Sequence, residues 1–409
     1  MSLPVFVSRF TLGGHRFLAT LAASQSDKKP AAVDRFKTFY HKDLQIELAT
    51  PKQRQPKPEN PENLKFGHNY ADHMMTVDWD SENGWHAPKI EPLTELKLHP
   101  GSKVLHYASE LFEGMKAYRG IDNKIRMFRP EMNMARMKRT AIRAALPDFD
   151  SEELIKIIVE MLKIDEEWVP HSDVCSLYLR PTLIGTDPTL GVGCPHSAKL
   201  FVITGPVGKY YTTGFDPVSL LADSRFIRAF PGGVGSYKMG CNYAPTILVG
   251  HEAAKRNCQQ VLWLHGENEE LTEVGTMNIF LYWINEHGEK ELITPPLDRG
   301  LILPGVTRDS LIELAKDFKE FKFTERNVTM EEVKQALAEK RLIEMFGCGT
   351  ACVVSPVGKI VHHNKKTDQY EELLIPTMSS EDNVMKRFYE TINDIQYGRL
   401  DRPGWMREV

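Results

Sequence analysis

The sequence of 409 residues lacks the features that would assign it to several specialised classes of protein. No apolar run approaches the ~20 residues of a membrane-spanning helix, so we expect no membrane partner. The net charge of -4 shows no basic excess, which argues against nucleic acid as a partner. The six cysteines form no Cys-x-x-Cys pair and no His-Glu-x-x-His motif occurs, so no metal site is expected and a reducing compartment is favoured.

The sequence also lacks the common nucleotide and hydrolase motifs. The segment 232–238 is rich in glycine and ends in lysine, but no Gly-Lys-Ser/Thr follows, so it is not a P-loop. No Gly-x-Gly-x-x-Gly opens a helix after a strand, and no Gly-x-Ser-x-Gly elbow is present. These absences argue against a P-loop or dinucleotide-binding enzyme and against an α/β-hydrolase.

The composition is that of an ordinary soluble globular protein, with 42% apolar and 26% charged residues. A chain of this length exceeds what one hydrophobic core usually serves, so two domains are expected. Strands and helices are mixed without a regular βαβ rhythm, which predicts an α+β fold class. We place a leader at 1–32, a smaller N-terminal domain with an extended arm at 33–207, an interdomain linker at 208–216 and a larger C-terminal domain at 217–409.

The first 26 residues contain no Asp or Glu, and Arg9 and Arg16 flank an apolar stripe. This composition is typical of a mitochondrial transit peptide and predicts a protein of the mitochondrial matrix. The alternative is an uncleaved tail on a cytoplasmic protein.

Local patterns predict several elements. Asp150, with Glu153 three residues later, has the spacing of a helix start, and Thr329 with Glu332 forms a second capping box. Strands are predicted at 73–79, 125–128 and 200–204, and helices at 132–146, 243–257, 330–339 and 380–397. In residues 174–181, apolar positions alternate with Tyr178 and Arg180, which therefore share one face of a strand. That pair could bind a carboxylate, or it could belong to an ordinary solvated face.

The most informative segment is 231–243, where Lys238 stands in a glycine-rich turn before a predicted helix. Glycines let a ligand approach the backbone, and a lysine away from bulk water can act as a nucleophile. By itself the segment could equally be a surface turn. Downstream lie Glu273, a helix start at 303–307 and a Gly-Cys-Gly-Thr-Ala turn at 347–351. A lysine, a carboxylate and a helix N-terminus together suit the aldehyde, pyridine nitrogen and phosphate of pyridoxal phosphate.

Seven ordered motifs then identify a family. They occupy residues 66–74, 111–118, 128–137, 177–181, 237–243, 271–278 and 302–308. From about residue 40 to the C-terminus the chain resembles branched-chain amino acid aminotransferases of fold type IV, the animal group in particular. The resemblance implies a two-domain α+β fold with the active site between the domains, and pyridoxal 5'-phosphate as the cofactor bound by the larger domain.

The resemblance also implies a role for each cofactor-binding residue. Lys238 matches the lysine that holds the cofactor and shuttles the proton, and Glu273 matches the carboxylate that faces the pyridine nitrogen. Tyr243 matches the tyrosine at the phenolic oxygen, and Arg136 matches the arginine at the phosphate. The remaining matches are Val306, Thr307 and Thr350 around the phosphate and Thr276 beside the ring.

The implied reaction moves the amino group of leucine, isoleucine or valine to 2-oxoglutarate, giving the branched 2-oxo acid and glutamate. Branched side chains would lie against aromatic walls, and the N–H groups of Thr350 and Ala351 would bind the α-carboxylate. The implied substrate contacts are Tyr70, Phe112, Tyr178 and Arg180. Tyr107 and the loop of Leu190, Gly191 and Val192 are expected to reach the pocket of a partner subunit, which makes a homodimer the catalytic unit.

The chain departs from the vertebrate pattern at one point. Vertebrate members carry Cys-x-x-Cys after the Gly-Thr-Ala turn, whereas here Ser355 stands three residues after Cys352, so no disulfide can form at that pair. Cys348 lies four residues before Cys352, and either two buried thiols or a substitute pair is conceivable from the sequence.

Two alternatives stay open at the level of sequence. A D-amino acid aminotransferase or aminodeoxychorismate lyase of the same fold needs a similar lysine, glutamate and phosphate site. A catalytically silent binding protein is the alternative from another class, against which the intact set of Lys238, Glu273 and Arg136 argues.

Overall fold

The computed structural model describes residues 34–58, 64–208 and 215–409, and residues 35–409 form one compact unit. The predicted leader at 1–32 and most of the predicted linker at 208–216 lie outside the described residues. In the part that is described, no helix has the length and apolar character needed to cross a membrane. That same part contains no cluster of His, Cys, Asp and Glu able to hold a metal ion.

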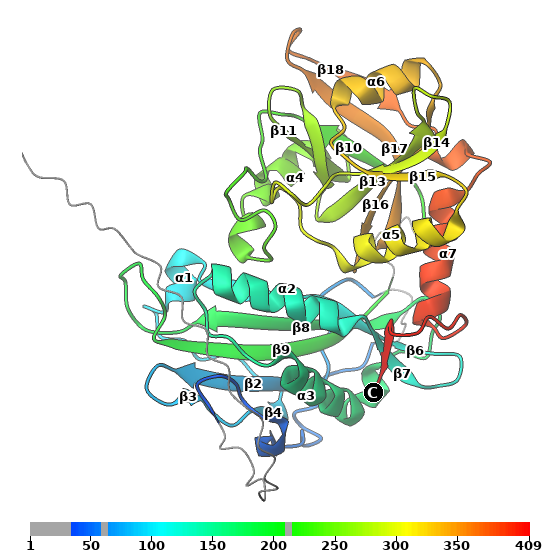
Figure 1. Cartoon of the computed structure of the whole chain (residues 1–409). Helices are drawn as coiled ribbons and strands as arrows, with labels where there is room; N and C mark the ends of the chain where they lie inside the picture. Colours follow the sequence, from blue (N-terminus) through cyan, green and yellow to red (C-terminus); the bar gives the residue numbers. More distant parts are fainter. Residues whose placement is uncertain (1–33, 59–63, 209–214) are drawn as a thin grey trace, which may run out of the picture. The chain divides into compact units, whose positions relative to one another are not determined.

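The first half of the chain builds a 10-stranded sheet in the order β1-β4-β2-β9-β8-β6-β7-β19, with β3 on β2 and β5 on β8. Its strands are β1 (Gln45–Ile46), β2 (His73–Asp80), β3 (Gly84–Trp85), β4 (Lys89–Pro92), β5 (Glu110–Phe112), β6 (Met115–Arg119), β7 (Ile125–Phe128), β8 (Ser176–Gly185), β9 (Ser197–Val207) and β19 (Met406–Glu408). The long strands β8 and β9 pair antiparallel along most of their length (Figure 1). Because β19 ends the chain, the C-terminus returns to the sheet of the first half.

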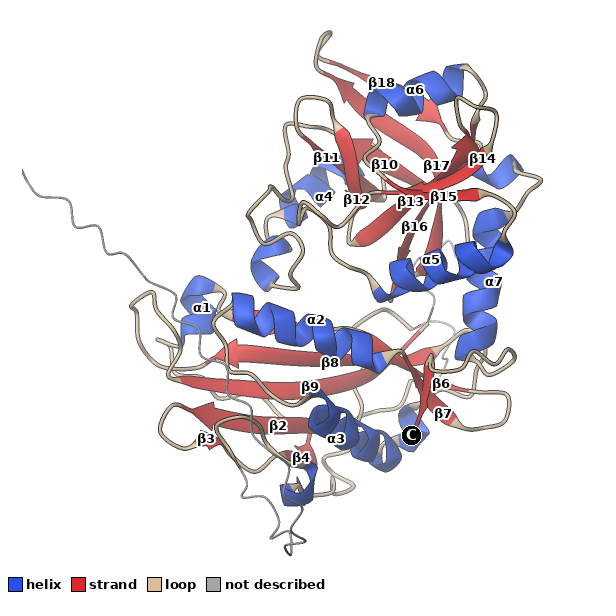
Figure 2. Ribbon diagram, viewed as in Figure 1, coloured by secondary structure: helices blue, strands red, loops and turns tan. Residues whose placement is uncertain are grey.

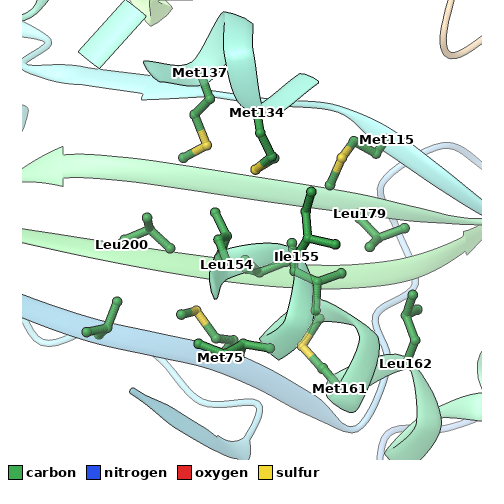
Figure 3. Close-up of a cluster of buried hydrophobic side chains, with 14 of the residues drawn as sticks. Met75, Met115, Met134, Met137, Leu154, Ile155, Met161, Leu162, Leu179 and Leu200 are labelled. Carbon is green, nitrogen blue, oxygen red and sulfur yellow. The ribbon is translucent and has the colours of Figure 1, made fainter. Parts of the chain in front are cut away.

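Two helices cover this sheet with apolar side chains. Met134 and Met137 of α2 (Pro130–Arg143) lie over the same strands as Leu154 and Ile155 of α3 (Ser151–Ile164), as Figure 3 shows. Leu179 contributes from β8 to this cluster, so the alternation predicted for that strand places Tyr178 and Arg180 on the face away from the core. A short helix, α1 (Lys103–Tyr107), precedes β5.

The second half builds a 9-stranded sheet in the order β12-β11-β10-β17-β16-β13-β14-β15, with β18 on β17. Its strands are β10 (Val218–Ala222), β11 (Gln260–His265), β12 (Glu270–Val274), β13 (Met277–Ile284), β14 (Lys290–Thr294), β15 (Lys322–Glu325), β16 (Leu342–Gly349), β17 (Val353–Asn364) and β18 (Gln369–Leu374). Since β12 also pairs with β13, six of these strands close into a small barrel (Figure 2). The helices are α4 (Thr246–Ala254), α5 (Val306–Phe318), α6 (Met330–Ala338) and α7 (Val384–Gln396).

Most predicted elements are present, and the α+β class is confirmed. The capping box of Thr329 and Glu332 forms as predicted. Asp150 caps α3, but Glu153 accepts a hydrogen bond from the backbone N–H of His41 rather than completing a box, because Thr38 already accepts from the Asp150 N–H.

Two helix starts were predicted wrongly. The predicted helix 243–257 begins only at Thr246, after a 3-10 turn at Gly240–Asn242, because Pro245 has no backbone N–H with which to continue the helical hydrogen bonds. The predicted helix 380–397 begins at Val384, since Asn383 adopts a left-handed conformation with φ 50.

Candidate functional site

A cavity of about 330 Å³ lies where side chains from both sheets meet. Twelve of the predicted site residues line it: Phe112, Arg136, Tyr178, Arg180, Lys238, Tyr243, Glu273, Thr276, Val306, Thr307, Thr350 and Ala351. These residues are spread over 240 positions of sequence, so the fold brings together most of the set that the motifs predicted.

Hydrogen bonds made by both polar groups of its own backbone hold Lys238 in place. Its N–H donates to Thr140 Oγ1 at 3.2 Å, and its carbonyl accepts from the Phe112 N–H at 3.1 Å. The Lys238 Nζ atom lies 3.2 Å from the Tyr243 hydroxyl and 4.6 Å from the centre of the Phe112 ring. The amine is therefore fixed in the cavity with a phenol beside it.

The turn around Lys238 needs glycine because its neighbours approach closely. A Cβ atom on Gly235 would lie 2.4 Å from Ala229 Cβ, and one on Gly240 would lie 1.5 Å from Glu110 Oε1. The amide of Asn242 donates to the carbonyls of Val234 and Tyr237 at 2.7 and 2.8 Å. These contacts give the turn one defined conformation, unlike a surface loop.

Glu273 lies on β12 with its carboxylate buried. One oxygen accepts from the Leu303 N–H at 2.7 Å, and the other lies 3.0 Å from the Arg228 guanidinium. Burial raises the pKa of Glu273, while Arg228 acts in the opposite direction. Sequence reasoning missed Arg228, because nothing in its local sequence indicates a partner 45 residues away.

Arg136 forms a second buried ion pair, with Glu113. Its Nε and Nη2 atoms donate to the Glu113 carboxylate at 2.7 and 2.8 Å, and Nη1 donates to the Pro304 carbonyl at 3.0 Å. Burial tends to raise the pKa of Glu113, but Arg136 outweighs it and the pKa is lowered. A guanidinium has five N–H donors, so two remain for a ligand. Glu113 was part of a quoted motif, but no site role was predicted for it.

Two groups of backbone N–H donors face the same cavity. Helix α5 begins at Val306 without a side-chain cap, which leaves the first-turn N–H groups of Val306 and Thr307 available to an anion. The other group is the turn that joins β16 to β17. Within the described residues, the N–H groups of Thr350 and Ala351 in this turn donate to no acceptor.

Another part of the cavity lining combines aromatic rings with the Arg180 guanidinium. The Arg180 guanidinium lies 4.7 Å from the centre of the Phe112 ring and donates to the Tyr178 hydroxyl at 3.0 Å. The Nε atom of Arg180 is buried without a hydrogen-bond partner among the described residues. Gly114 makes room for this arrangement, since a Cβ there would lie 2.1 Å from the Tyr178 hydroxyl.

Four predicted substrate residues do not line the cavity in the single chain. Tyr70 lies in a neighbouring pocket that shares Tyr178 and Arg180 with the cavity. Tyr107 donates a hydrogen bond to the Leu190 carbonyl, and the Leu190 and Val192 side chains are 66% and 85% exposed. Exposed apolar side chains in this position agree with the expectation that they act in a partner subunit, which stays a prediction.

The cysteines near the site are unsuited to easy oxidation. Cys348 is buried, and burial raises the pKa of its thiol. Burial also raises the pKa of Cys352 to about 12, and its Sγ atom lies 3.0 Å from Met277 Sδ. Ser355 is buried, with a hydroxyl that has no partner among the described residues. Since the thiolate is the reactive form, neither thiol is activated here.

Comparison with known proteins identifies close relatives. The family described as amino-transferase class IV matches residues 110–360. The cytosolic branched-chain-amino-acid aminotransferase of Caenorhabditis elegans is 72% identical over 415 residues, covering 100% of both chains. The cytosolic enzyme of Mus musculus is 54% identical over 373 residues, covering 91% of this chain and 94% of the mouse protein.

These relatives contradict the prediction of a mitochondrial matrix protein, because both are cytosolic forms. The prediction used only the lack of acidic residues and the apolar stripe beside Arg9 and Arg16. Gly13 and Gly14 interrupt that stripe and weaken the helix that a transit peptide would form. Composition alone was therefore a poor guide to the compartment.

The fold comparison agrees with the sequence relatives. The branched-chain aminotransferase of the archaeon Thermoproteus uzoniensis, solved with norvaline, has a TM-score of 0.64 and 24% sequence identity, and the match covers 82% of this chain and 99% of that one. At this identity the likeness shows the fold alone. The chain belongs to the branched-chain amino acid aminotransferases, within the class IV aminotransferase family.

Proposed function

We propose that this chain acts as a homodimeric, pyridoxal phosphate-dependent aminotransferase that moves the amino group of leucine, isoleucine or valine to 2-oxoglutarate. The products are the branched 2-oxo acid and glutamate. One observation carries the proposal: the amine of Lys238, the carboxylate of Glu273 and the free N-terminus of α5 line one cavity. Family membership supports the same reaction.

The described residues fit the cofactor at each of its polar groups. The N–H groups of Val306 and Thr307, with the two spare donors of Arg136, would hold the phosphate. Glu273 would face the pyridine nitrogen, and Tyr243 would face the phenolic oxygen. When bound, pyridoxal phosphate supplies an aldehyde that accepts the amino group and a protonated ring that accepts electron density from the substrate α-carbon.

Lys238 would perform the proton transfer. Its Nζ atom lies in the cavity, and it would take the proton from the α-carbon. The Tyr243 hydroxyl, 3.2 Å away, can hold the amine in place between turnovers. Glu273 would keep a positive charge on the pyridine nitrogen, for which its carboxylate must stay ionised despite burial. Arg228 provides the counter-charge for this.

The aromatic wall accounts for two different substrates. Phe112 and Tyr178 offer apolar surface to a branched side chain, which gains on the order of 25 cal/mol per Å² on burial. 2-Oxoglutarate has a second carboxylate at the end of its side chain, and Arg180 with its unpartnered Nε can bind it. We propose that each substrate uses a different part of this wall.

The test is direct. Purified protein with pyridoxal phosphate and 2-oxoglutarate should form glutamate with each L-branched amino acid in turn, and should not react with the D-isomers. Glutamate formation from D-amino acids alone would favour the related D-specific enzymes. No turnover by a protein that binds the cofactor would favour a silent binding protein.

A further inference from the structure

The hairpin turn Gly349–Cys352 separates two cavities. Ala351 and Cys352 line both the site cavity and a second cavity of about 250 Å³ behind the turn. Lys116 of β6 lines the second cavity only. Its Nζ atom donates to the Ala351 carbonyl at 2.9 Å, so the lysine contacts the turn from the side opposite to the site cavity.

Lys116 is a buried cation without a counter-ion. The residue is 6% exposed, and no carboxylate forms an ion pair with it anywhere in residues 34–58, 64–208 or 215–409. An ammonium group removed from water without an anionic partner is costly. The cost falls if an anion binds nearby. The Thr350 and Ala351 N–H groups, which the family resemblance assigns to the α-carboxylate, lie in the same turn at the site cavity.

We propose that Lys116 is a positioning residue for substrate binding, which anchors the Gly349–Cys352 turn from behind and stabilises the carboxylate bound in front of it. This inference rests on the proposed function and on the role that the family resemblance implies for the N–H groups of Thr350 and Ala351, which is to bind the α-carboxylate. The Ala351 carbonyl belongs to the peptide unit that directly follows the two units carrying the Thr350 and Ala351 N–H groups, so the hydrogen bond from Lys116 restrains the turn that presents these donors. The positive charge of Lys116 then favours a carboxylate bound on the other side of this turn.

The proposal predicts that carboxylate binding depends on pH. Burial lowers the pKa of Lys116 to about 8, so the charge is present below that pH and is lost as the pH rises through it. The other titratable groups that face Lys116 come from several elements: Cys352 in the turn, Cys175 before β8, Tyr118 on β6, Tyr397 after α7, and Asp173 at the cavity wall. Burial raises the pKa of Cys352 to about 12, and raises those of Tyr118 and Tyr397.

The experiment measures binding rather than turnover. The probe is 4-methylvaleric acid, which has no amino group to transfer, and its Kd for the cofactor-loaded protein is measured by calorimetry from pH 6.5 to 9.5. The corresponding neutral amide is the control ligand. We expect the acid to bind about tenfold more weakly above pH 9 than at pH 7, while the affinity for the amide stays constant.

Variants of Lys116 distinguish the effect of its positive charge from an effect on folding. Lys116→Met should weaken acid binding about tenfold at pH 7 and abolish its dependence on pH near 8, while kcat at saturating substrate changes less than threefold. Lys116→Arg should keep tight binding at pH 9. The matched control, Lys199→Met on β9, should behave as the parent.

A folded, cofactor-loaded Lys116→Met protein with the parent's Kd and pH profile would overturn the inference. If that variant does not fold, equal pH profiles of the acid and the amide on the parent would overturn it. Failure of the parent to transaminate would instead count against the proposed function, so the two failures are distinguishable.

Discussion

Among the individual residues of the candidate site, two buried ion pairs stand out. Glu113 with Arg136 and Glu273 with Arg228 each join a carboxylate to a guanidinium at 2.7 and 3.0 Å. Breaking a buried pair by removing one partner leaves a charge without compensation, which is more damaging than replacing both. Each pair therefore holds in place a charge that the proposed cofactor would contact.

Arg228→Met should destabilise the protein, because Glu273 would be left buried without its counter-charge. We expect a loss of about 3–5 kcal/mol in the free energy of unfolding, measured by denaturant titration at pH 7.5. The double variant Arg228→Met/Glu273→Gln should recover part of this loss. Equal stability of the single variant and the parent would show that the pair contributes nothing.

Arg136→Ala should weaken cofactor binding more than it lowers turnover at saturating cofactor. A charge-assisted contact to a phosphate contributes roughly 1.5–3 kcal/mol, so the cofactor Kd should rise by more than tenfold. Arg143→Ala, at the exposed end of the same helix, is the control. If both variants bind the cofactor equally tightly, Arg136 does not contact the phosphate.

Sequence reasoning succeeded at the scale of elements where the signal is local. The capping box of Thr329 and the alternation in β8 depend on neighbouring residues, and both were predicted. The start of α7 was not predicted, because its cap comes from another part of the chain. The Glu344 carboxylate on β16 accepts hydrogen bonds from the N–H groups of Val384 and Met385 at 3.0 and 2.7 Å.

Glu344→Gln should therefore destabilise α7 specifically. The amide has one acceptor oxygen where the carboxylate has two, and hydrogen bonds to charged groups contribute about 1.5–3 kcal/mol. We expect a decrease of this size in the unfolding free energy and faster amide exchange at 384–386. Thr329→Ala, which removes a local cap from α6, should cost about 1 kcal/mol and leave exchange at α7 unchanged.

For the whole molecule, the motifs predicted which residues gather at the site. They did not predict the buried contacts that keep those residues in position. Lys238, Glu273 and Arg136 carry family motifs, whereas Arg228 and Lys116 act through partners 45 and 235 residues away. The Arg228–Glu273 pair forms within the second half of the chain, whereas the Lys116–Ala351 contact joins the two sheets, and no local pattern encodes either. Local patterns also do not indicate the surroundings of Tyr107, Leu190 and Val192, because their predicted role requires a second copy of the chain.

The loop that carries Leu190 is anchored although its apolar side chains are exposed. The buried ammonium of Lys103 donates to the Thr189 hydroxyl and the Gly191 carbonyl at 2.6 and 2.7 Å. Exposed apolar residues on an anchored loop favour a docking surface for a second copy. The double variant Leu190→Asp/Val192→Asp should shift the protein toward monomer in sedimentation and lower kcat/KM at least tenfold. Leu374→Asp, on an equally exposed position of β18, should do neither.

Lys238 is the amine proposed to hold the cofactor. Borohydride reduction of the cofactor-loaded protein, followed by proteolysis and mass spectrometry, locates the modified lysine. We expect a pyridoxyl phosphate group on the peptide that contains Lys238, and no such adduct in Lys238→Ala. Labelling of another lysine, including the buried Lys116, in the parent protein would contradict it.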